Sequence, residues 1–279
     1  MQKALSYINK ELSELYPESE IKSIGYLIIE KITGFSRTQL IVNKNTIFSD
    51  EQHHLIESFV QKLKKNIPIQ YILGEEYFMG MKFQVNSSVL IPRPETEELI
   101  EWIVEGNGKK TGLRMLDIGT GSGCIAISLK SLFPESVVTA FDISETALEV
   151  ARSNANINHL SVGFQCVDIL NPPLFQEKWD IIVSNPPYIT HSEKTFMEPN
   201  VLEHEPHLAL FVPDNDPLLF YRAIAIFGLK NMVDGGKLYF EINRAYGPET
   251  KTMLESLGYR QVELRKDISG NDRMIQAVK

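Results

Sequence analysis

The sequence has 279 residues, of which 43% are hydrophobic and 23% are charged, and its formal net charge is −8. This length allows one large domain and a smaller one, and the composition is typical of a globular protein in water. The acidic balance and the scattered lysines argue against duplex nucleic acid as the main ligand, because such ligands favour a basic patch that displaces counterions.

The beginning of the chain and its cysteines indicate a cellular compartment. Residues 1–20 carry charges throughout and lack a continuous apolar segment, so we expect no signal peptide. The apolar runs are too short for a membrane span. Cys124 and Cys166 each lie in an apolar segment, which favours small buried side chains in a reducing compartment over a disulfide or a metal site. We therefore expect a cytoplasmic protein with no membrane partner and no metal.

Residues 1–70 are predicted to form a small helical domain. One helix is predicted to end near Gly34, and a second to run from Ser49 to about Lys65, because Ser49 and Gln52 have the spacing of a capping box. The first of these helices is indicated by a broadly helical pattern of apolar residues, namely Ile21, Tyr26, Leu27, Ile29 and Ile32.

Residues 71–93 are predicted to form a β-hairpin followed by a proline-rich connector. The stretch from Gly74 to Val85 alternates aromatic and apolar residues with glycine breaks. Pro92 and Pro94 hold the following segment extended, and a helix is expected to start at Pro94 or Thr96. The connector should therefore be stiff.

Residues 94–279 are predicted to form an α/β domain with a Rossmann-like, mostly parallel sheet of seven strands. From residue 112 onward, apolar runs of strand length alternate with helical segments, which is the pattern of such a sheet. The expected strands are 113–118, 137–141, 162–167, 179–184, 237–242, 261–266 and 273–278.

A glycine-rich turn follows the first of these strands and precedes the helical run Cys124–Leu132. Its glycines allow the backbone to approach a ligand closely at the start of a helix. The acid before them, Asp117, could accept a hydrogen bond from an ammonium group or orient the loop. A glycine-rich turn alone is shared with nicotinamide and flavin enzymes. The candidate cofactor-binding residues here are Asp117, Gly119, Thr120, Gly121, Ser122 and Gly123.

The next two strands also end in carboxylates. Asp142 comes about 20 residues after the glycines, where an acid can hold a ribose diol, although it could also cap the helix that follows. Asp168 could accept from an exocyclic amine while Ile169 packs against the ring. Together with the glycine turn, these residues predict a nucleoside with a charged tail.

The fourth strand end is Asn185-Pro186-Pro187-Tyr188, directly behind the apolar run 179–183. Each proline fixes its own φ and keeps the preceding residue extended, so the carbonyl groups cannot fold back into a helix. The result is a rigid set of acceptors suited to an –NH2 group. A similar tripeptide at Asn171 has no buried strand before it and is predicted to be a loop.

Taken together, these four strand ends resemble a class I S-adenosylmethionine-dependent methyltransferase that acts on a planar amide or amino nitrogen. The connector Val89–Glu97 and the helical first domain narrow the resemblance to the HemK/PrmC family of peptide chain release factor N5-glutamine methyltransferases. Further landmarks that resemble this family are Glu205-Pro206, Ala209-Leu210, Tyr221-Arg222, Glu241-Ile242 and Asp272-Arg273.

The resemblance implies S-adenosylmethionine as methyl donor, S-adenosylhomocysteine as product, and the glutamine of a Gly-Gly-Gln motif in a release factor as acceptor. Residues 1–70 would then recognise the protein substrate. At the reacting centre, the Asn185 side-chain oxygen and the Pro186 carbonyl are expected to accept the two N–H groups of the glutamine amide. Pro187 and Tyr188 complete the substrate site, with Tyr188 packed against the amide to close the pocket.

Several alternatives stay open at this point. The acceptor could be a glutamine of a ribosomal protein or an amino group of a nucleic acid, although the acidic charge and the lack of a basic aromatic platform disfavour the latter. A nicotinamide-dependent oxidoreductase and a non-catalytic scaffold are the other two. His204, Glu205 and His207 lie close in sequence but lack the spacing of a metal site.

Overall fold

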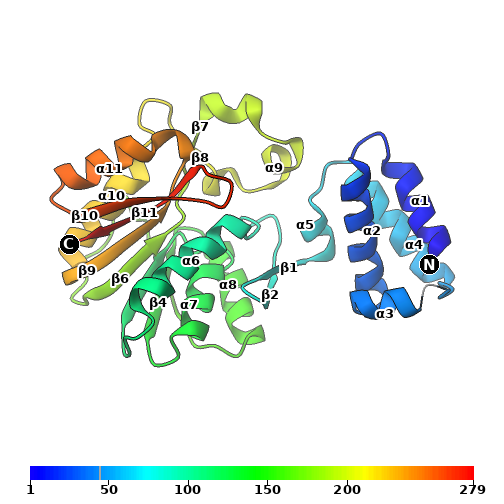
Figure 1. The fold of residues 1–279 in the computed structure, drawn as a ribbon, viewed down its shortest axis with the longest axis horizontal. Coiled ribbons are helices and arrows are strands. Elements are labelled where there is room, and N and C mark those ends of the chain that lie inside the picture. The colour runs from blue at the N-terminus through cyan, green and yellow to red at the C-terminus, as the bar shows by residue number, and fades with distance from the viewer. Residues whose placement is uncertain (44) are drawn as a thin grey trace. The chain divides into compact units, whose positions relative to one another are not determined.

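The computed structural model describes residues 1–43 and 45–279, which form two compact units (Figure 1). The first comprises Met1–Gly74 together with Glu198–His204, and the second comprises Glu75–Met197 together with Glu205–Lys279. Each has its own apolar core. The domain boundaries predicted after residues 70 and 93 stay a prediction.

The first unit is helical, as predicted. The left-handed Gly34 ends one helix, and Ser49 begins another by a capping box in which its hydroxyl accepts from the Gln52 amide. A core of isoleucine, leucine and phenylalanine side chains joins the helices. They are α1 (Gln2–Leu12), α2 (Glu18–Thr33), α3 (Arg37–Val42), α4 (Asp50–Leu63) and α5 (Ile69–Leu73). The unit also contains α9 (Pro199–His204), which has no buried residue.

A seven-stranded sheet forms the centre of the second unit, in the order β10-β11-β9-β6-β3-β4-β5. The strands from β9 to β5 run parallel, whereas β11 pairs antiparallel with both β9 and β10, so the predicted mostly parallel sheet is confirmed. The strands are β3 (Arg114–Ile118), β4 (Val137–Asp142), β5 (Gly163–Cys166), β6 (Trp179–Ser184), β9 (Met232–Glu241), β10 (Arg260–Lys266) and β11 (Asp272–Val278).

Two smaller pairs of strands accompany this sheet. The predicted hairpin is confirmed as β1 (Glu75–Phe78) and β2 (Met81–Gln84). The short parallel pair β7 (Ile189–Thr190) and β8 (Phe211–Val212) follows the fourth predicted strand end and was not expected from the sequence.

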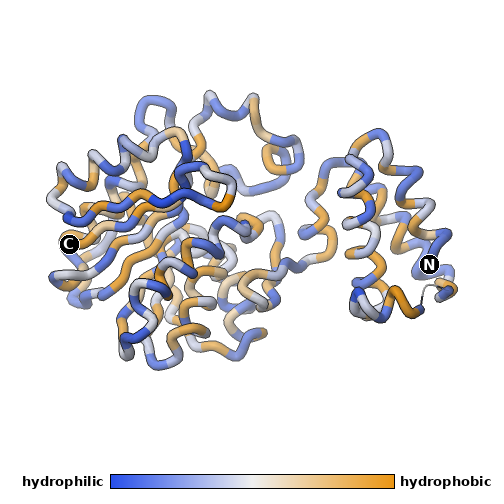
Figure 2. Tube along the Cα trace, viewed as in Figure 1, coloured by the Kyte–Doolittle hydropathy of each residue, from blue (hydrophilic) through white to orange (hydrophobic). Residues whose placement is uncertain are grey.

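Helices cover both faces of the seven-stranded sheet (Figure 1). Because successive side chains of a strand point to opposite faces, Met115 joins the core under α6 and α7, whereas Leu116 joins the core under α10 and α11. Figure 2 shows hydrophobic colour along the central strands. The helices are α6 (Pro94–Asn107), α7 (Cys124–Leu132), α8 (Glu145–Ile157), α10 (Leu219–Asn231) and α11 (Gly247–Ser256), with short 3-10 helices η1 (His191–Phe196), η2 (His207–Ala209) and η3 (Arg244–Tyr246).

Two local predictions have different outcomes. The prediction that both cysteines are buried is wrong for Cys166 and only partly met by Cys124, which is half-buried. Cys166 is exposed because β5 is the last strand of the sheet and has only one neighbour. The prediction of a loop at Asn171 is confirmed, since no helix or strand is formed there. No helix among residues 1–43 and 45–279 has both the length and the apolar character needed to cross a membrane.

A glycine in α10 provides a test of the packing. A Cβ added at Gly228 would meet the Tyr259 hydroxyl oxygen at 2.5 Å and the Met232 sulfur at 3.1 Å. Alanine usually stabilises a helix interior by about 1 kcal/mol over glycine, but overpacking costs about 1–3 kcal/mol. We therefore expect Gly228→Ala to lower the free energy of unfolding in urea. In a Tyr259→Phe background the cost should shrink, and an equal cost in both backgrounds would contradict the assigned contact.

Candidate functional site

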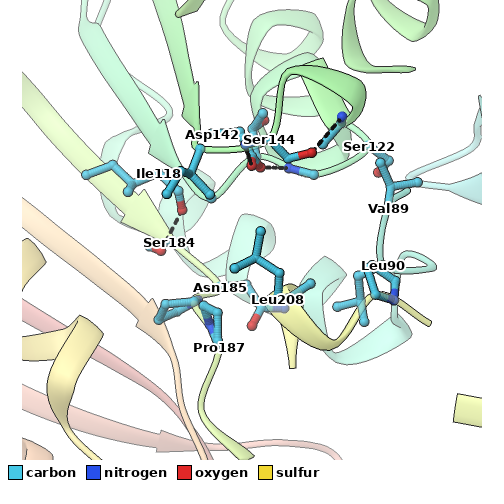
Figure 3. A pocket seen from close by; sticks show the side chains of 18 of the residues that line it. Val89, Leu90, Ile118, Ser122, Asp142, Ser144, Ser184, Asn185, Pro187 and Leu208 are labelled. Carbon is cyan, nitrogen blue, oxygen red and sulfur yellow. Dashed lines mark hydrogen bonds between the residues drawn. The ribbon is translucent and has the colours of Figure 1, made fainter. Parts of the chain in front are cut away.

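A cavity of about 490 Å³ lies at the carboxyl edge of the parallel strands β3, β4 and β6 (Figure 3). Its volume is in the range of small-molecule sites, and its position is where open α/β sheets bind ligands. Most of the site residues predicted from the sequence line it, namely Gly119, Thr120, Gly121, Ser122, Asp142, Asp168, Ile169, Asn185, Pro186 and Pro187. Asp117, Gly123 and Tyr188 are not among the lining residues.

The glycine turn forms one wall of this cavity. Gly119, Gly121 and Gly123 all have positive φ, which L-residues with side chains adopt only at a cost. A Cβ at Gly119 or Gly121 would meet nothing within 4 Å, so the backbone presents an open face at both positions. The amide groups of Gly119 and Thr120 donate to the Phe141 carbonyl, which fixes the turn to the end of β4.

Asp117 lies behind this turn. It has no exposed surface, and its carboxylate accepts a hydrogen bond of 2.6 Å from the Thr120 hydroxyl. Burial raises the pKa of Asp117 to about 7. Of the two roles considered for this acid, its position outside the cavity wall favours orienting the loop over direct contact with a ligand.

Asp142 joins the end of β4 to the glycine turn (Figure 3). One carboxylate oxygen accepts from the Gly121 amide at 2.8 Å, and the other accepts from the Ser144 amide at 2.9 Å. Burial raises the pKa of Asp142. The alternative prediction that Asp142 caps the following helix is wrong, because the Ser144 side chain caps α8 by accepting from Ala147. Each oxygen keeps a lone pair for a ligand hydroxyl.

Asp168 and Ile169 line the cavity next to Asp142. The Asp168 carboxylate accepts from the Leu170 amide and from the Asn171 side chain, both at 2.9 Å. These bonds hold the carboxylate in a turn just beyond β5. An acceptor and an apolar side chain therefore stand together, as the binding of an amino-substituted ring requires.

Asn185, Pro186 and Pro187 line the same cavity just beyond β6 (Figure 3). The Ser184 hydroxyl donates to the Ile118 carbonyl at 2.6 Å and ties the ends of β6 and β3 together. The Asn185 side-chain nitrogen donates to the Thr96 hydroxyl oxygen at 3.3 Å. This bond leaves the Asn185 side-chain oxygen as an acceptor.

Tyr188 is directed differently from the sequence prediction. Its hydroxyl donates to the Glu241 carboxylate at 3.2 Å, and its ring is not part of the cavity wall. Burial and the Glu241 charge raise the pKa of Tyr188. The structure therefore does not bring Tyr188 into the cavity alongside Asn185.

The cavity wall that faces the strand ends was not predicted from the sequence. It comes from the connector and from a segment around η2, and Figure 3 shows Val89, Leu90 and Leu208 on this side. Buried Glu205 pairs with Arg93 at 2.5 Å and accepts from the Ile91 amide at 3.3 Å, which holds the connector in place. The prolines of the connector signalled its stiffness but not its partner.

Metal ligation finds no support in the part of the chain that the structure describes. No group of three or more His, Cys, Asp or Glu side chains that could hold a metal occurs among residues 1–43 and 45–279. His204, Glu205 and His207 are close in sequence. Glu205 pairs with Arg93, and the His204 ring nitrogen lies 2.8 Å from the Lys65 carbonyl oxygen.

The fold and the cavity define a class I methyltransferase. Residues 96–205 match the family model of the methyltransferase small domain, and residues 3–74 match that of the PrmC N-terminal domain. A solved methyltransferase from Pyrococcus furiosus has the same fold, with a TM-score of 0.55 and 19% identity over 72% of this chain and 90% of that one.

Curated relatives narrow the class to a family. The release factor glutamine methyltransferase of Flavobacterium psychrophilum is 47% identical over 95% of this chain and 94% of its own length. That of Bacteroides thetaiotaomicron is 48% identical over 99% of both chains. The chain belongs to the release factor glutamine methyltransferase family, which confirms the resemblance seen in the sequence.

Two glycines of the turn differ in what surrounds them. A Cβ at Gly123 would lie 2.9 Å from the Ile127 side chain and 3.1 Å from that of Ala151, whereas a Cβ at Gly121 would lie in open space. Both changes to alanine cost about 1–2 kcal/mol through positive φ, and only Gly123→Ala adds overpacking. We expect Gly123→Ala to lower the free energy of unfolding more than its matched control Gly121→Ala. Equal losses in urea titrations would contradict this account.

The buried Asp117 should make stability depend on pH. Its native pKa of about 7 lies above the ordinary aspartate pKa of 3.8, so between these values the native state keeps a proton that the unfolded chain has lost. The wild-type free energy of unfolding should therefore fall as pH rises from about 4 to about 7. The free energy of unfolding of Asp117→Asn should rise relative to that of wild type by up to about 4 kcal/mol across this window. Urea titrations at several pH values measure the difference, and a constant difference would contradict the burial effect.

Proposed function

We propose that this protein transfers the methyl group of S-adenosylmethionine to the side-chain amide nitrogen, N5, of a glutamine in a peptide chain release factor. The observation that carries the proposal is the acceptor set of Asn185 and Pro186 in the same cavity as the glycine turn and two carboxylates. The names of the curated relatives support the choice of release factor and of glutamine. S-adenosylhomocysteine is the expected second product.

The residues of the cavity fit S-adenosylmethionine in kind and in order. The open backbone at Gly119 and Gly121 suits the amino acid part, Asp142 offers acceptors for the ribose hydroxyls, and Asp168 with Ile169 suits the adenine ring. When bound, the cofactor supplies an electrophilic methyl group on a sulfonium.

The task of the protein is to make an amide nitrogen attack this methyl group. The nitrogen is a poor nucleophile because its lone pair is delocalised into the carbonyl group. Two acceptors, the Asn185 side-chain oxygen and the Pro186 carbonyl, would each take one N–H group of the substrate. They stabilise the positive charge that develops on nitrogen and hold its lone pair in one direction. The proton leaves after methyl transfer, so no strong base is needed beforehand.

A narrow protein loop suits this cavity, and the Gly-Gly-Gln loop of a release factor is the proposed substrate. We assign recognition of the rest of the release factor to the helical region of residues 1–70, whose end lies near that of the matched PrmC N-terminal domain, residues 3–74. The net charge of −8 supports a protein acceptor over a nucleic acid. We place the reaction in the cytoplasm, where release factors meet ribosomes.

Methyl transfer to purified release factor tests the proposal. Wild-type protein with S-adenosylmethionine should add one methyl group to the glutamine, as located by peptide mass spectrometry. Asn185→Ala should reduce the rate by about 10²–10³-fold or more, because one of two preorganised hydrogen-bonding groups is lost. Binding of S-adenosylmethionine, measured by calorimetry, should survive in this variant.

Asn156→Ala is a matched control, since Asn156 is exposed on α8 and outside the cavity wall. It should methylate at the wild-type rate. Ribosomal proteins and DNA serve as competing acceptors in parallel assays. Methylation of either in place of release factor, or none at all, would overturn the proposed substrate.

A further inference from the structure

A chain of buried polar side chains continues from Asn185 into the interior. Thr96 and Glu241 are only 2% and 1% exposed. The Thr96 hydroxyl donates to one Glu241 oxygen at 2.6 Å, and Tyr188 donates to the other at 3.2 Å. The mechanism above uses neither Thr96 nor Glu241, although the cost of burying a carboxylate requires an explanation.

The direction of these hydrogen bonds follows from their chemistry. A threonine hydroxyl has one proton and two lone pairs, and an ionised carboxylate can only accept. The Thr96 proton is therefore committed to Glu241, and the group that Thr96 presents to Asn185 is a lone pair. Only the –NH2 end of the Asn185 amide can bond to it, as the 3.3 Å contact between Asn185 Nδ2 and Thr96 Oγ1 shows.

Several contacts support the negative charge on Glu241 that this argument requires. Both Glu241 oxygens receive a hydroxyl proton, as suits the ionised form. Burial raises the pKa of Glu241, whereas the Thr96 hydroxyl and the Arg273 charge oppose that shift. Arg273 is itself held by Asp267 at 3.2 Å.

The orientation of the Asn185 amide decides what the cavity can bind. With its nitrogen turned to Thr96, the amide offers its oxygen to a substrate –NH2 group. With the amide reversed, two –NH2 groups would face each other and no hydrogen bond would form. The second acceptor, the Pro186 carbonyl, belongs to the backbone and cannot reverse. The Asn185 side chain is thus the one member of the acceptor pair that needs to be oriented.

We propose that Thr96 and Glu241 are positioning residues for methyl transfer, which fix the Asn185 amide with its oxygen toward the substrate nitrogen. The inference rests on the proposed function and deepens it, because it explains how the acceptor set is kept in its active form. It also gives the proline-rich connector, which lines the cavity, a second role in placing Thr96. Pro94 begins α6, and the first turn of this helix places Thr96 between Asn185 and Glu241.

The hydrogen bonds that link Glu241 through Thr96 to Asn185 are called the relay below. Thr96→Val tests the relay, with Thr96→Ser as its matched control. Valine keeps the shape of threonine without the hydroxyl, whereas serine keeps the hydroxyl. We expect Thr96→Val to lower kcat roughly 10–100-fold. This is the range found when a hydrogen-bond partner that orients a metal-binding side chain is removed, and Thr96 orients Asn185 in a comparable way. KM for release factor and the Kd of S-adenosylmethionine should change less than about 2-fold, because loss of an interaction made only in the transition state lowers kcat and kcat/KM equally.

The control variant and a change at the carboxylate complete the kinetic test. Thr96→Ser should keep kcat within about 3-fold of wild type, since the hydrogen bonds are retained. Glu241→Leu should behave like Thr96→Val, because leucine has no acceptor for the Thr96 proton and Thr96 could then donate to a reversed Asn185 amide. Equal kcat losses in Thr96→Val and Thr96→Ser, or a wild-type kcat in Thr96→Val, would overturn the relay.

A second measurement separates failure of the relay from failure of the proposed function. The side-chain –NH2 resonances of Asn185, assigned by their loss in Asn185→Ala, report its hydrogen bond without any substrate. They should be protected from solvent exchange in wild type and Thr96→Ser and unprotected in Thr96→Val. If wild type leaves release factor unmethylated but this pattern holds, the proposed substrate is wrong and the relay stands. Identical protection in all three proteins would overturn the relay.

Discussion

The site depends on the parallel alignment of β6, β3 and β4, because parallel strands place their carboxyl ends at the same edge of the sheet. Hydrogen bonds made by the last residues of these strands then join the strand ends to one another and to the glycine turn. Ser184 binds the Ile118 carbonyl, and Asp142 binds the Gly121 amide. The loop that could hold the methyl donor and the segment that could hold the acceptor are thereby joined to one rigid base. Their relative position is set by backbone pairing rather than by surface loops.

Three buried acids around this base show how charge is used to hold geometry. Asp117 accepts from Thr120, Asp142 accepts from two backbone amides, and Glu241 accepts from two hydroxyl groups. Burial raises the pKa of each, so each costs stability that an apolar residue would not. When ionised, such an acid supplies direction in return, because a carboxylate can only accept and so fixes the proton of every donor that it meets.

The sequence predicted the backbone of the site well and its side-chain directions less well. Strand periodicity and the order of glycine turn, acids and proline tetrad depend on local pattern, and all were found at one sheet edge. The placement of Tyr188 on Glu241 and of Asp117 behind its loop depends on contacts between distant segments. The pairing of Thr96 with Glu241 spans 145 residues, and no local pattern contains it. The exposure of Cys166 depends on which strand ends the sheet.

The two proposed acceptors at the end of β6, Asn185 and Pro186, are fixed by different means, and this difference would explain why the connector belongs to the methyltransferase domain. The Pro186 carbonyl is held by proline rings on both sides of its peptide, which restrict the backbone without any partner. A side-chain amide has no such restriction, because exchanging its oxygen and nitrogen leaves its shape almost unchanged. Only a neighbour whose donor and acceptor roles are already decided can choose between the two states. Thr96 is such a neighbour because Glu241 has taken its proton, and Thr96 reaches this position because the prolines before it start α6 at Pro94.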